Sequence, residues 1–135
     1  MGLLDIFRRK KKKEQNKNVE SAKLITELER LCEDDKATYE ALLNTMFLDP
    51  RKIEISMKEA AENAKRFERE KDFLKADVWY KIAGGIAIYE GNVKKVVEFF
   101  GECERLLPDT KYLILKNPEK AVLKAQEYYK MHLKG

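Results

Sequence analysis

The first eighteen residues hold the side chains whose types and spacing point most directly to chemistry. Four large apolar residues directly precede six consecutive cations, and residues 1–18 carry a formal charge of +5, whereas the rest of the chain is almost neutral. A charge confined to one end predicts an interaction with an anionic partner. The apolar residues are Leu3, Leu4, Ile6 and Phe7, and the cations are Arg8, Arg9, Lys10, Lys11, Lys12 and Lys13.

We interpret this segment first as a membrane-surface anchor. If it becomes helical, Leu3, Ile6 and Phe7 share one face that can enter the interface of a bilayer. The cations that follow would then lie near anionic lipid headgroups, each contributing about 1 kcal/mol at best. The combination predicts weak, reversible and salt-sensitive attachment to a membrane.

Two other interpretations stay open. The cations could neutralise phosphates of a nucleic acid or of the ribosome, although this leaves the four apolar residues unexplained. The stretch Leu3 to Phe7 could instead dock in the groove of a protein partner or of a second copy of this chain. In the docking interpretation the cations would serve solubility or steering.

The remaining sequence offers little that could catalyse a reaction. His132 is the only histidine, so a helical site for two metals cannot be assembled. Gly84 and Gly85 lie inside a predicted helix and lack the Lys-Ser/Thr of a phosphate-binding loop. Cys32 and Cys103 form no CxxC motif, and we predict two reduced thiols packed in the interior. We expect no enzyme activity, no bound metal and no cofactor.

Composition indicates the kind of organism that the protein comes from and its location in the cell. Charged residues make up 39% of the chain, mostly Lys and Glu, and glutamine is scarce, which is typical of hyperthermophile proteins. No run of eighteen apolar residues exists, so no membrane-spanning helix is predicted. The apolar stretch near the N-terminus is short and precedes the cations, unlike a secretory signal. We expect a cytoplasmic protein that attaches to the inner face of the cell membrane.

From Val19 onward only helical periodicity appears. We therefore divide the chain into a tail and linker at 1–18 and an all-α domain at 19–135. Residues 19–48 predict either one long helix or two helices that are separated near Glu33. We favour two helices, with Asp34 or Asp35 as the N-cap of the second.

Further helix starts are marked by capping residues. Asp49 followed by Pro50 predicts a helix from Pro50 to about Glu70, because proline suits the first helical position. Ser56 and Glu59 also fit a capping box, which would start the helix one turn later. The last helix is predicted to start at Asn117-Pro118, after a short apolar turn at residues 112–115.

The predicted helix after Asp72 is the centre of the domain. Apolar residues cover nearly its whole circumference, which predicts burial on several sides. Gly84 and Gly85 each cost about 1 kcal/mol relative to alanine inside a helix, so we expect a neighbouring helix to approach closely there. Gly91 ends this helix, and Asn92 caps the next one, which ends at Pro108.

The spacing of small and aromatic residues resembles the tetratricopeptide repeat over about residues 60–109. One register uses Ala64, Phe67, Ala76, Tyr80 and Ala83, and a second uses Tyr80, Gly84, Gly91, Val96, Phe100, Cys103 and Pro108. The two registers start twenty residues apart instead of the thirty-four of tandem repeats, so one helix must serve both. Residues 61–83 also resemble the three-helix MIT domain of membrane-trafficking proteins.

The resemblance implies a right-handed array of antiparallel helical hairpins, with five to six helices, that binds peptides or protein partners. It implies no catalytic residue. The expected core residues are Ala64, Phe67, Ala76, Tyr80, Ala83, Gly84, Val96, Phe100 and Cys103. Taken together, the sequence predicts a non-catalytic adaptor that is held at a membrane by its tail, with nucleic-acid binding and self-association left open.

Overall fold

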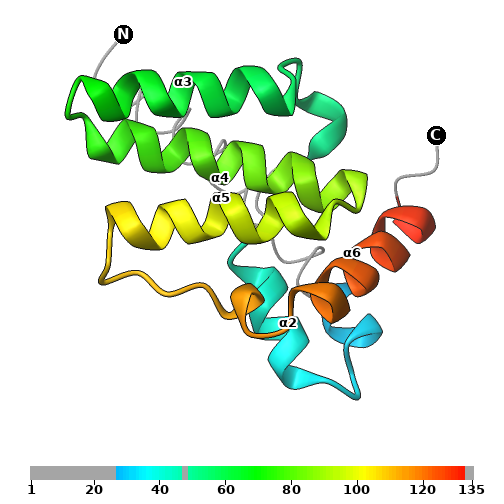
Figure 1. Cartoon of the computed structure of the whole chain (residues 1–135). Coiled ribbons are helices and arrows are strands. Elements are labelled where there is room, and N and C mark those ends of the chain that lie inside the picture. The colour runs from blue at the N-terminus through cyan, green and yellow to red at the C-terminus, as the bar shows by residue number, and fades with distance from the viewer. Residues whose placement is uncertain (1–26, 47–48, 133–135) are drawn as a thin grey trace, which may run out of the picture.

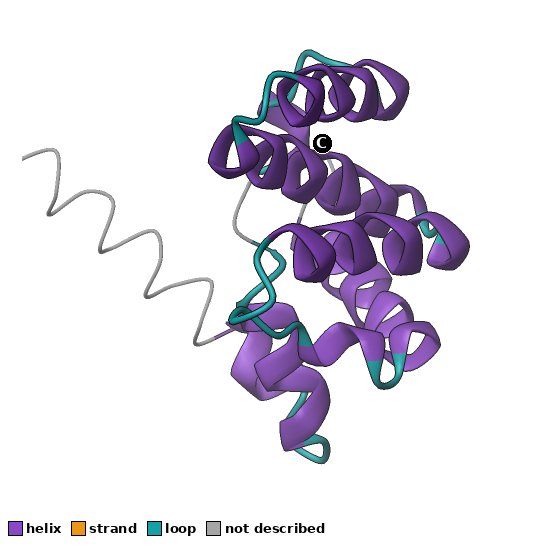
Figure 2. Cartoon of the chain, turned by 60° about the vertical axis from the view of Figure 1, so that its left-hand side comes forward, coloured by secondary structure: helices purple, strands orange, loops and turns teal. Residues whose placement is uncertain are grey.

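The computed structural model describes residues 27–46 and 49–132, and every regular element in these ranges is a helix (Figures 1 and 2). The predicted all-α class is confirmed, and the α-helices together with a helical segment at 27–31 match the five to six expected. The tail at 1–18 lies outside the described residues. The elements are α2 (Lys36–Leu43), η1 (Pro50–Lys52), α3 (Met57–Arg69), α4 (Phe73–Glu90), α5 (Val93–Leu106), η2 (Leu113–Leu115) and α6 (Pro118–His132).

Helices α3, α4 and α5 run antiparallel side by side and form one layer (Figure 1). Helix α6 contacts α4 and α5, and α2 packs on α6 and η2. The main core lies where these two groups meet, and its largest fully buried side chains include Phe100, Ile88 and Ile114. Helix α4 packs against both α3 and α5 and is therefore shared by two hairpins.

A capping aspartate separates α2 from the helical segment that precedes it. The Asp35 carboxylate accepts hydrogen bonds from the Thr38 backbone N–H at 3.1 Å and from the Thr38 hydroxyl at 2.6 Å. It also pairs with Lys120 Nζ at 2.6 Å, in the first turn of α6. These interactions hold the pKa of Asp35 well below its usual range, with the Lys120 contact as the largest cause. The predicted break is confirmed, and its cap also links α2 to α6.

The predicted helix start at Pro50 is wrong. Asp49 caps only a single 3₁₀ turn, in which the Arg51 backbone N–H donates to its carboxylate at 3.0 Å and the Arg51 guanidinium at 2.9 Å. The backbone is already extended at Ile53. Helix α3 begins at Met57, where Ser56 Oγ accepts a hydrogen bond from the Glu59 N–H at 3.1 Å. The capping box is therefore the signal that starts the regular helix.

The two glycines inside α4 have different environments. A Cβ atom on Gly84 would lie 2.6 Å from Cε2 of Phe100, so α5 does approach closely there, as expected. A Cβ atom on Gly85 would meet nothing within 4 Å, so the same expectation fails for Gly85. Burial of α4 is also less complete than predicted, because Leu74 is 71% exposed and Val78 is 51% exposed. One face of this apolar helix is open to solvent.

The expected core residues are buried with one exception. Phe67 is only half-buried, and its ring lies beneath the Arg66 guanidinium and the Lys75 ammonium, 4.9 and 5.4 Å from the ring centroid. The long stems of these cations cover the ring in place of a neighbouring helix. The buried residues are Ala64, Ala76, Tyr80, Ala83, Gly84, Val96, Phe100 and Cys103.

Candidate protein-binding groove

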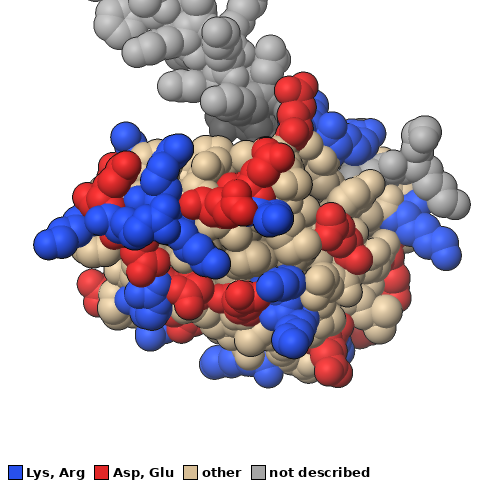
Figure 3. Space-filling view, turned by 45° about the horizontal axis from the view of Figure 1, so that its top comes forward, with Lys and Arg blue, Asp and Glu red and all other residues tan. Residues whose placement is uncertain are grey.

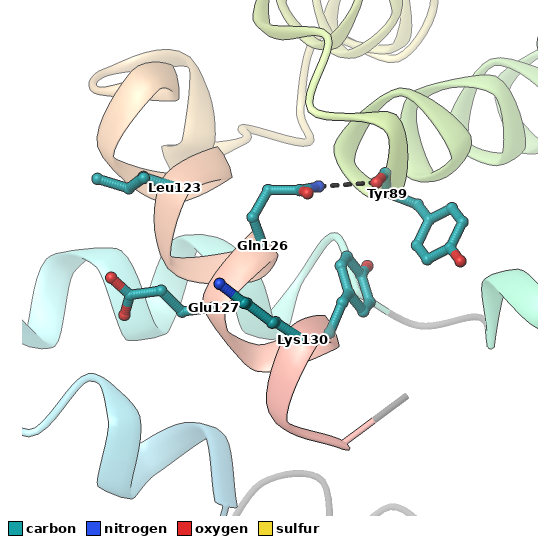
Figure 4. A pocket seen from close by; sticks show the side chains of 6 residues that line it. Tyr89, Leu123, Gln126, Glu127 and Lys130 are labelled. Carbon is teal, nitrogen blue, oxygen red and sulfur yellow. Dashed lines mark hydrogen bonds between the residues drawn. The ribbon is translucent and has the colours of Figure 1, made fainter. Parts of the chain in front are cut away.

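An open hollow of about 590 Å³ lies between the C-terminal end of α4 and the outer face of α6 (Figure 4). One wall is the aromatic end of α4, and the floor and other wall come from a single face of α6. We call this hollow the α4–α6 groove. It is lined by Tyr89, Leu123, Gln126, Glu127, Tyr129 and Lys130.

Gln126 holds the two walls of the groove together. The last carbonyls of a helix lack partners within the helix, and the Gln126 amide donates to one of them, Tyr89 O, at 2.7 Å (Figure 4). It also donates at 2.6 Å to Ile88 O, which accepts the Gly91 backbone N–H as well. Gly91 ends α4 in the left-handed conformation, with φ of 72°, which turns the chain away towards α5. The carbonyls stay accessible to α6 as a result.

Two tyrosines give the groove its aromatic side. The rings of Tyr89 and Tyr129 meet edge to face with centroids 5.2 Å apart. Tyr129 is buried, and this burial raises the pKa of its phenol above the ordinary value. Tyr89 is 41% exposed and presents its outer surface to solvent. The buried ring therefore orients the exposed one.

The remaining lining is one apolar side chain with charges beside it. Leu123 is 62% exposed on α6. Glu127 accepts from Lys124 Nζ at 3.3 Å, whereas Lys130 forms no ion pair with the described residues. An exposed leucine and tyrosine with a few polar groups around them are typical of a protein-binding surface, where aromatic anchors carry much of the affinity. The shallow shape suits a helix or peptide better than an enclosed small molecule.

The histidine and the possible metal ligands that the sequence offers lie outside the α4–α6 groove. His132 Nδ1 lies 3.3 Å from Glu27 Oε2, and its ring lies against the Tyr128 ring, tilted by 40° with the centroids 4.7 Å apart. The Glu27 contact joins the end of α6 to the helical segment at 27–31. Among the described residues, no group of three or more His, Cys, Asp or Glu side chains is placed to hold a metal ion.

Both cysteines are buried and unbonded. The Cys103 thiol lies against α4, where Sγ donates to Asp77 O at 3.7 Å. Burial is the largest cause that raises the pKa of both thiols, and for Cys103 it raises the pKa far above the usual range. Since the thiolate is the nucleophile, these thiols are poorly reactive in the folded protein.

The groove was not predicted from the sequence. Tyr128 and Tyr129 are adjacent on α6, yet both are only 8% exposed. The exposed tyrosine is Tyr89 instead. Leu123 is the signal that could have been used, since it is a large apolar residue on the otherwise charged outer face of α6.

Comparison with known proteins does not assign this chain to a family. No protein-family model matches the chain, and no curated protein or solved structure matches it. Among the described residues, no helix is both long enough and apolar enough to cross a bilayer. The candidate site therefore rests on the geometry of the α4–α6 groove.

Proposed function

We propose that this protein is a non-catalytic adaptor that binds protein partners while its N-terminal segment holds it at the cytoplasmic face of a membrane. The α4–α6 groove is the observation that carries the proposal, because it exposes an oriented tyrosine beside an exposed leucine. The tetratricopeptide-like spacing of residues 60–109 supports the same function. The helical hairpins serve as the scaffold, and residues 1–18 serve as the anchor.

The groove suits the apolar face of a short helix from a partner. Burying an apolar side chain the size of leucine contributes about 1.5–3 kcal/mol, and Leu123 still exposes most of its surface. Tyr89 is held by Tyr129 before any partner arrives, so little conformational freedom is lost at this ring on binding. Glu127 and Lys130 would set the orientation of the partner at the rim.

The groove is tested by selecting binders from a library of helical peptides and measuring their affinity for the full chain. Leu123→Asp and Tyr89→Ala should each weaken the selected peptides at least tenfold. The matched control is Met131→Asp, because Met131 is 64% exposed on the same helix but does not line the groove. Equal weakening by the control would show that the groove is not the binding surface.

The anchor is tested by co-sedimentation of the full chain with neutral and anionic vesicles at low and high salt. Binding should require anionic lipid and fall with Phe7→Ala and with Lys10→Gln/Lys11→Gln. Lys94→Gln/Lys116→Gln is the control, because these two exposed lysines lie in the domain and form no ion pair with the described residues. A chain that binds RNA and is indifferent to Phe7→Ala would favour the nucleic-acid alternative.

A further inference from the structure

The turn between α3 and α4 gathers cations at one end of the helical layer. Residues 65–75 contain five basic and three acidic residues. The turn lies at the left in Figure 1, and Figure 3 shows Lys and Arg side chains gathered on that side, with carboxylates among them. We call residues 65–75 the α3–α4 tip. Its cations are Lys65, Arg66, Arg69, Lys71 and Lys75.

Most of the negative charge at the tip is already paired. Glu68 Oε1 binds Arg105 Nη2 at 2.7 Å, and Asp72 caps α4 and lies 3.6 Å from Lys75 Nζ. The other four cations of the tip form no ion pair with any described residue. The tip therefore keeps an excess of uncompensated positive charge.

Two large apolar side chains are exposed beside these cations. Phe73 is 45% exposed and Leu74 is 71% exposed, and they occupy the first turn of α4. Elsewhere the first turns of α3 and α6 carry acidic residues, as is usual at a helix N-terminus. Exposed apolar residues beside unpaired cations are the combination that suits the surface of an anionic bilayer.

The backbone of the tip places a lysine at a position that favours glycine. Lys71 has a φ of 62°, the left-handed conformation that a side chain disfavours. The equivalent residue of the α4–α5 turn is Gly91, with a φ of 72°. Lys71 therefore adds a positive charge that the equivalent position of the α4–α5 turn lacks.

We infer that the α3–α4 tip is a second contact with anionic lipid, in which Phe73 and Leu74 enter the interface and the four unpaired cations lie near the headgroups. This inference rests on the proposed attachment through the tail, and it adds the orientation of the domain on the membrane. The tip faces the bilayer, whereas the α4–α6 groove lies at the other end of α4 and stays open to a partner. A nucleic acid would use the cations but leave Leu74 without a role.

The direct test places an environment-sensitive fluorophore on Leu74→Cys in the full chain and adds vesicles of phosphatidylcholine with phosphatidylserine. The control is Leu123→Cys, which is similarly exposed but lies in the α4–α6 groove. Cys32 and Cys103 are buried, so the new thiol is labelled selectively. We expect a blue shift and protection from an aqueous quencher at position 74 and neither at position 123. No change at position 74, or equal changes at both, would overturn the inference.

Vesicle binding by substituted full chains separates the tip from the tail. Arg66→Gln/Arg69→Gln and Lys71→Gly should each lower partitioning, by about fivefold per cation removed, and Leu74→Gln should lower it further while Leu123→Gln does not. Thermal unfolding shows that each variant is folded, and Lys71→Gly should melt no lower than the parent.

The outcomes are distinct for the two proposals. If the tail variants lose binding and the tip variants behave as the parent, the tip inference fails and the anchor proposal stands. If the tip variants lose binding and the tail variants do not, the anchor proposal fails and the tip is the lipid contact by itself, which overturns its role as a second contact. If removing the cations matters but Leu74→Gln does not, the tip binds phosphate without entering lipid, which also overturns the inference.

Discussion

The α3–α4 and α4–α5 turns have the same backbone and different surroundings. Each turn contains one left-handed residue, Lys71 or Gly91, and the next residue donates its backbone N–H at 2.9 Å to a carbonyl five residues earlier, Phe67 O in one turn and Ala87 O in the other. That same residue, Asp72 or Asn92, then caps the following helix. The α4–α5 turn packs against Gln126 of α6, whereas the α3–α4 turn faces solvent. Identical local structure therefore serves packing in one place and exposure in the other.

The comparison extends to the aromatic residue that lies eight positions after each capping residue, Tyr80 after Asp72 and Phe100 after Asn92. Tyr80 and Phe100 are twenty residues apart, and both are buried, at 3% and 0% exposure. Phe100 packs against Gly84 and the Tyr112 ring, with no polar atom to satisfy. Tyr80 instead donates its hydroxyl to Glu68 Oε1 at 3.2 Å, an oxygen that it shares with Arg105. The Phe100 ring thus lies wholly in the core, whereas the Tyr80 side chain reaches from the core to charged residues at its edge.

The largest expected effect comes from removing either aromatic ring. Tyr80→Ala and Phe100→Ala should each lower the free energy of unfolding by about 3–5 kcal/mol, because both leave a cavity in a buried site. Phe67→Ala is the comparison, and it should cost clearly less because that ring is half-buried. Urea unfolding measures all three. A loss below about 1 kcal/mol for Tyr80→Ala would contradict the burial of α4 on its α3 side.

The adjacent glycines of α4 should respond in opposite directions. Gly84→Ala should destabilise by about 1–3 kcal/mol, because the new Cβ would overlap the Phe100 ring. Gly85→Ala should stabilise by up to about 1 kcal/mol, because its Cβ meets nothing and alanine favours the helix. Thermal or urea unfolding tests the pair. Combining Gly84→Ala with Phe100→Leu should recover part of the loss if the overlap is its cause.

The two left-handed residues provide a smaller and reciprocal test. Gly91→Ala should destabilise by about 1–2 kcal/mol, because alanine resists a φ of 72°. Lys71→Gly should stabilise by about 1 kcal/mol for the same reason. Both changes are read from urea unfolding of the full chain. Equal and small effects would mean that the turns relax to a right-handed backbone when substituted.

The smallest expected effect depends on pH and separates Tyr80 from Phe100. The pKa of Tyr80 is raised to about 12, with burial as the largest cause and the neighbouring Glu68 carboxylate as the next. The unfolded phenol loses its proton near pH 10, so the unfolded state binds fewer protons between the two values and stability falls as pH rises. Between pH 8 and pH 10.5 this difference in proton binding lowers the free energy of unfolding by about 1 kcal/mol.

Tyr80→Phe should remove this part of the pH dependence, because a phenylalanine has no proton to lose. The expected result is a smaller fall in melting temperature between pH 8 and pH 10.5 than in the parent chain. Burial also raises the pKa of Tyr112, Tyr128 and Tyr129, so some alkaline destabilisation should remain. An unchanged profile would show that Tyr80 is not shielded from water.

Local signals in the sequence determined the helices. Asp35, Ser56, Asp72, Asn92 and Asn117 each cap a helix through a hydrogen bond to a backbone N–H three residues later, and such contacts depend only on neighbours in the chain. The same locality explains why the break near Asp35 was predicted and why the alternative start at Ser56 was available. The cap and proline at Asp49-Pro50 start only one 3₁₀ turn, because the backbone becomes extended at Ile53.

The tertiary structure decided which faces are covered. The apolar circumference of α4 predicted burial on several sides, but only the approach of α3, α5 and α6 determines that Gly84 meets a ring while Gly85 and Leu74 face outward. The α4–α6 groove has the same origin, since Tyr89 and Gln126 are thirty-seven residues apart and meet only after α6 packs on α4. Sequence periodicity records that a residue is apolar, whereas burial depends on which surface arrives opposite it, and no local rule specifies that.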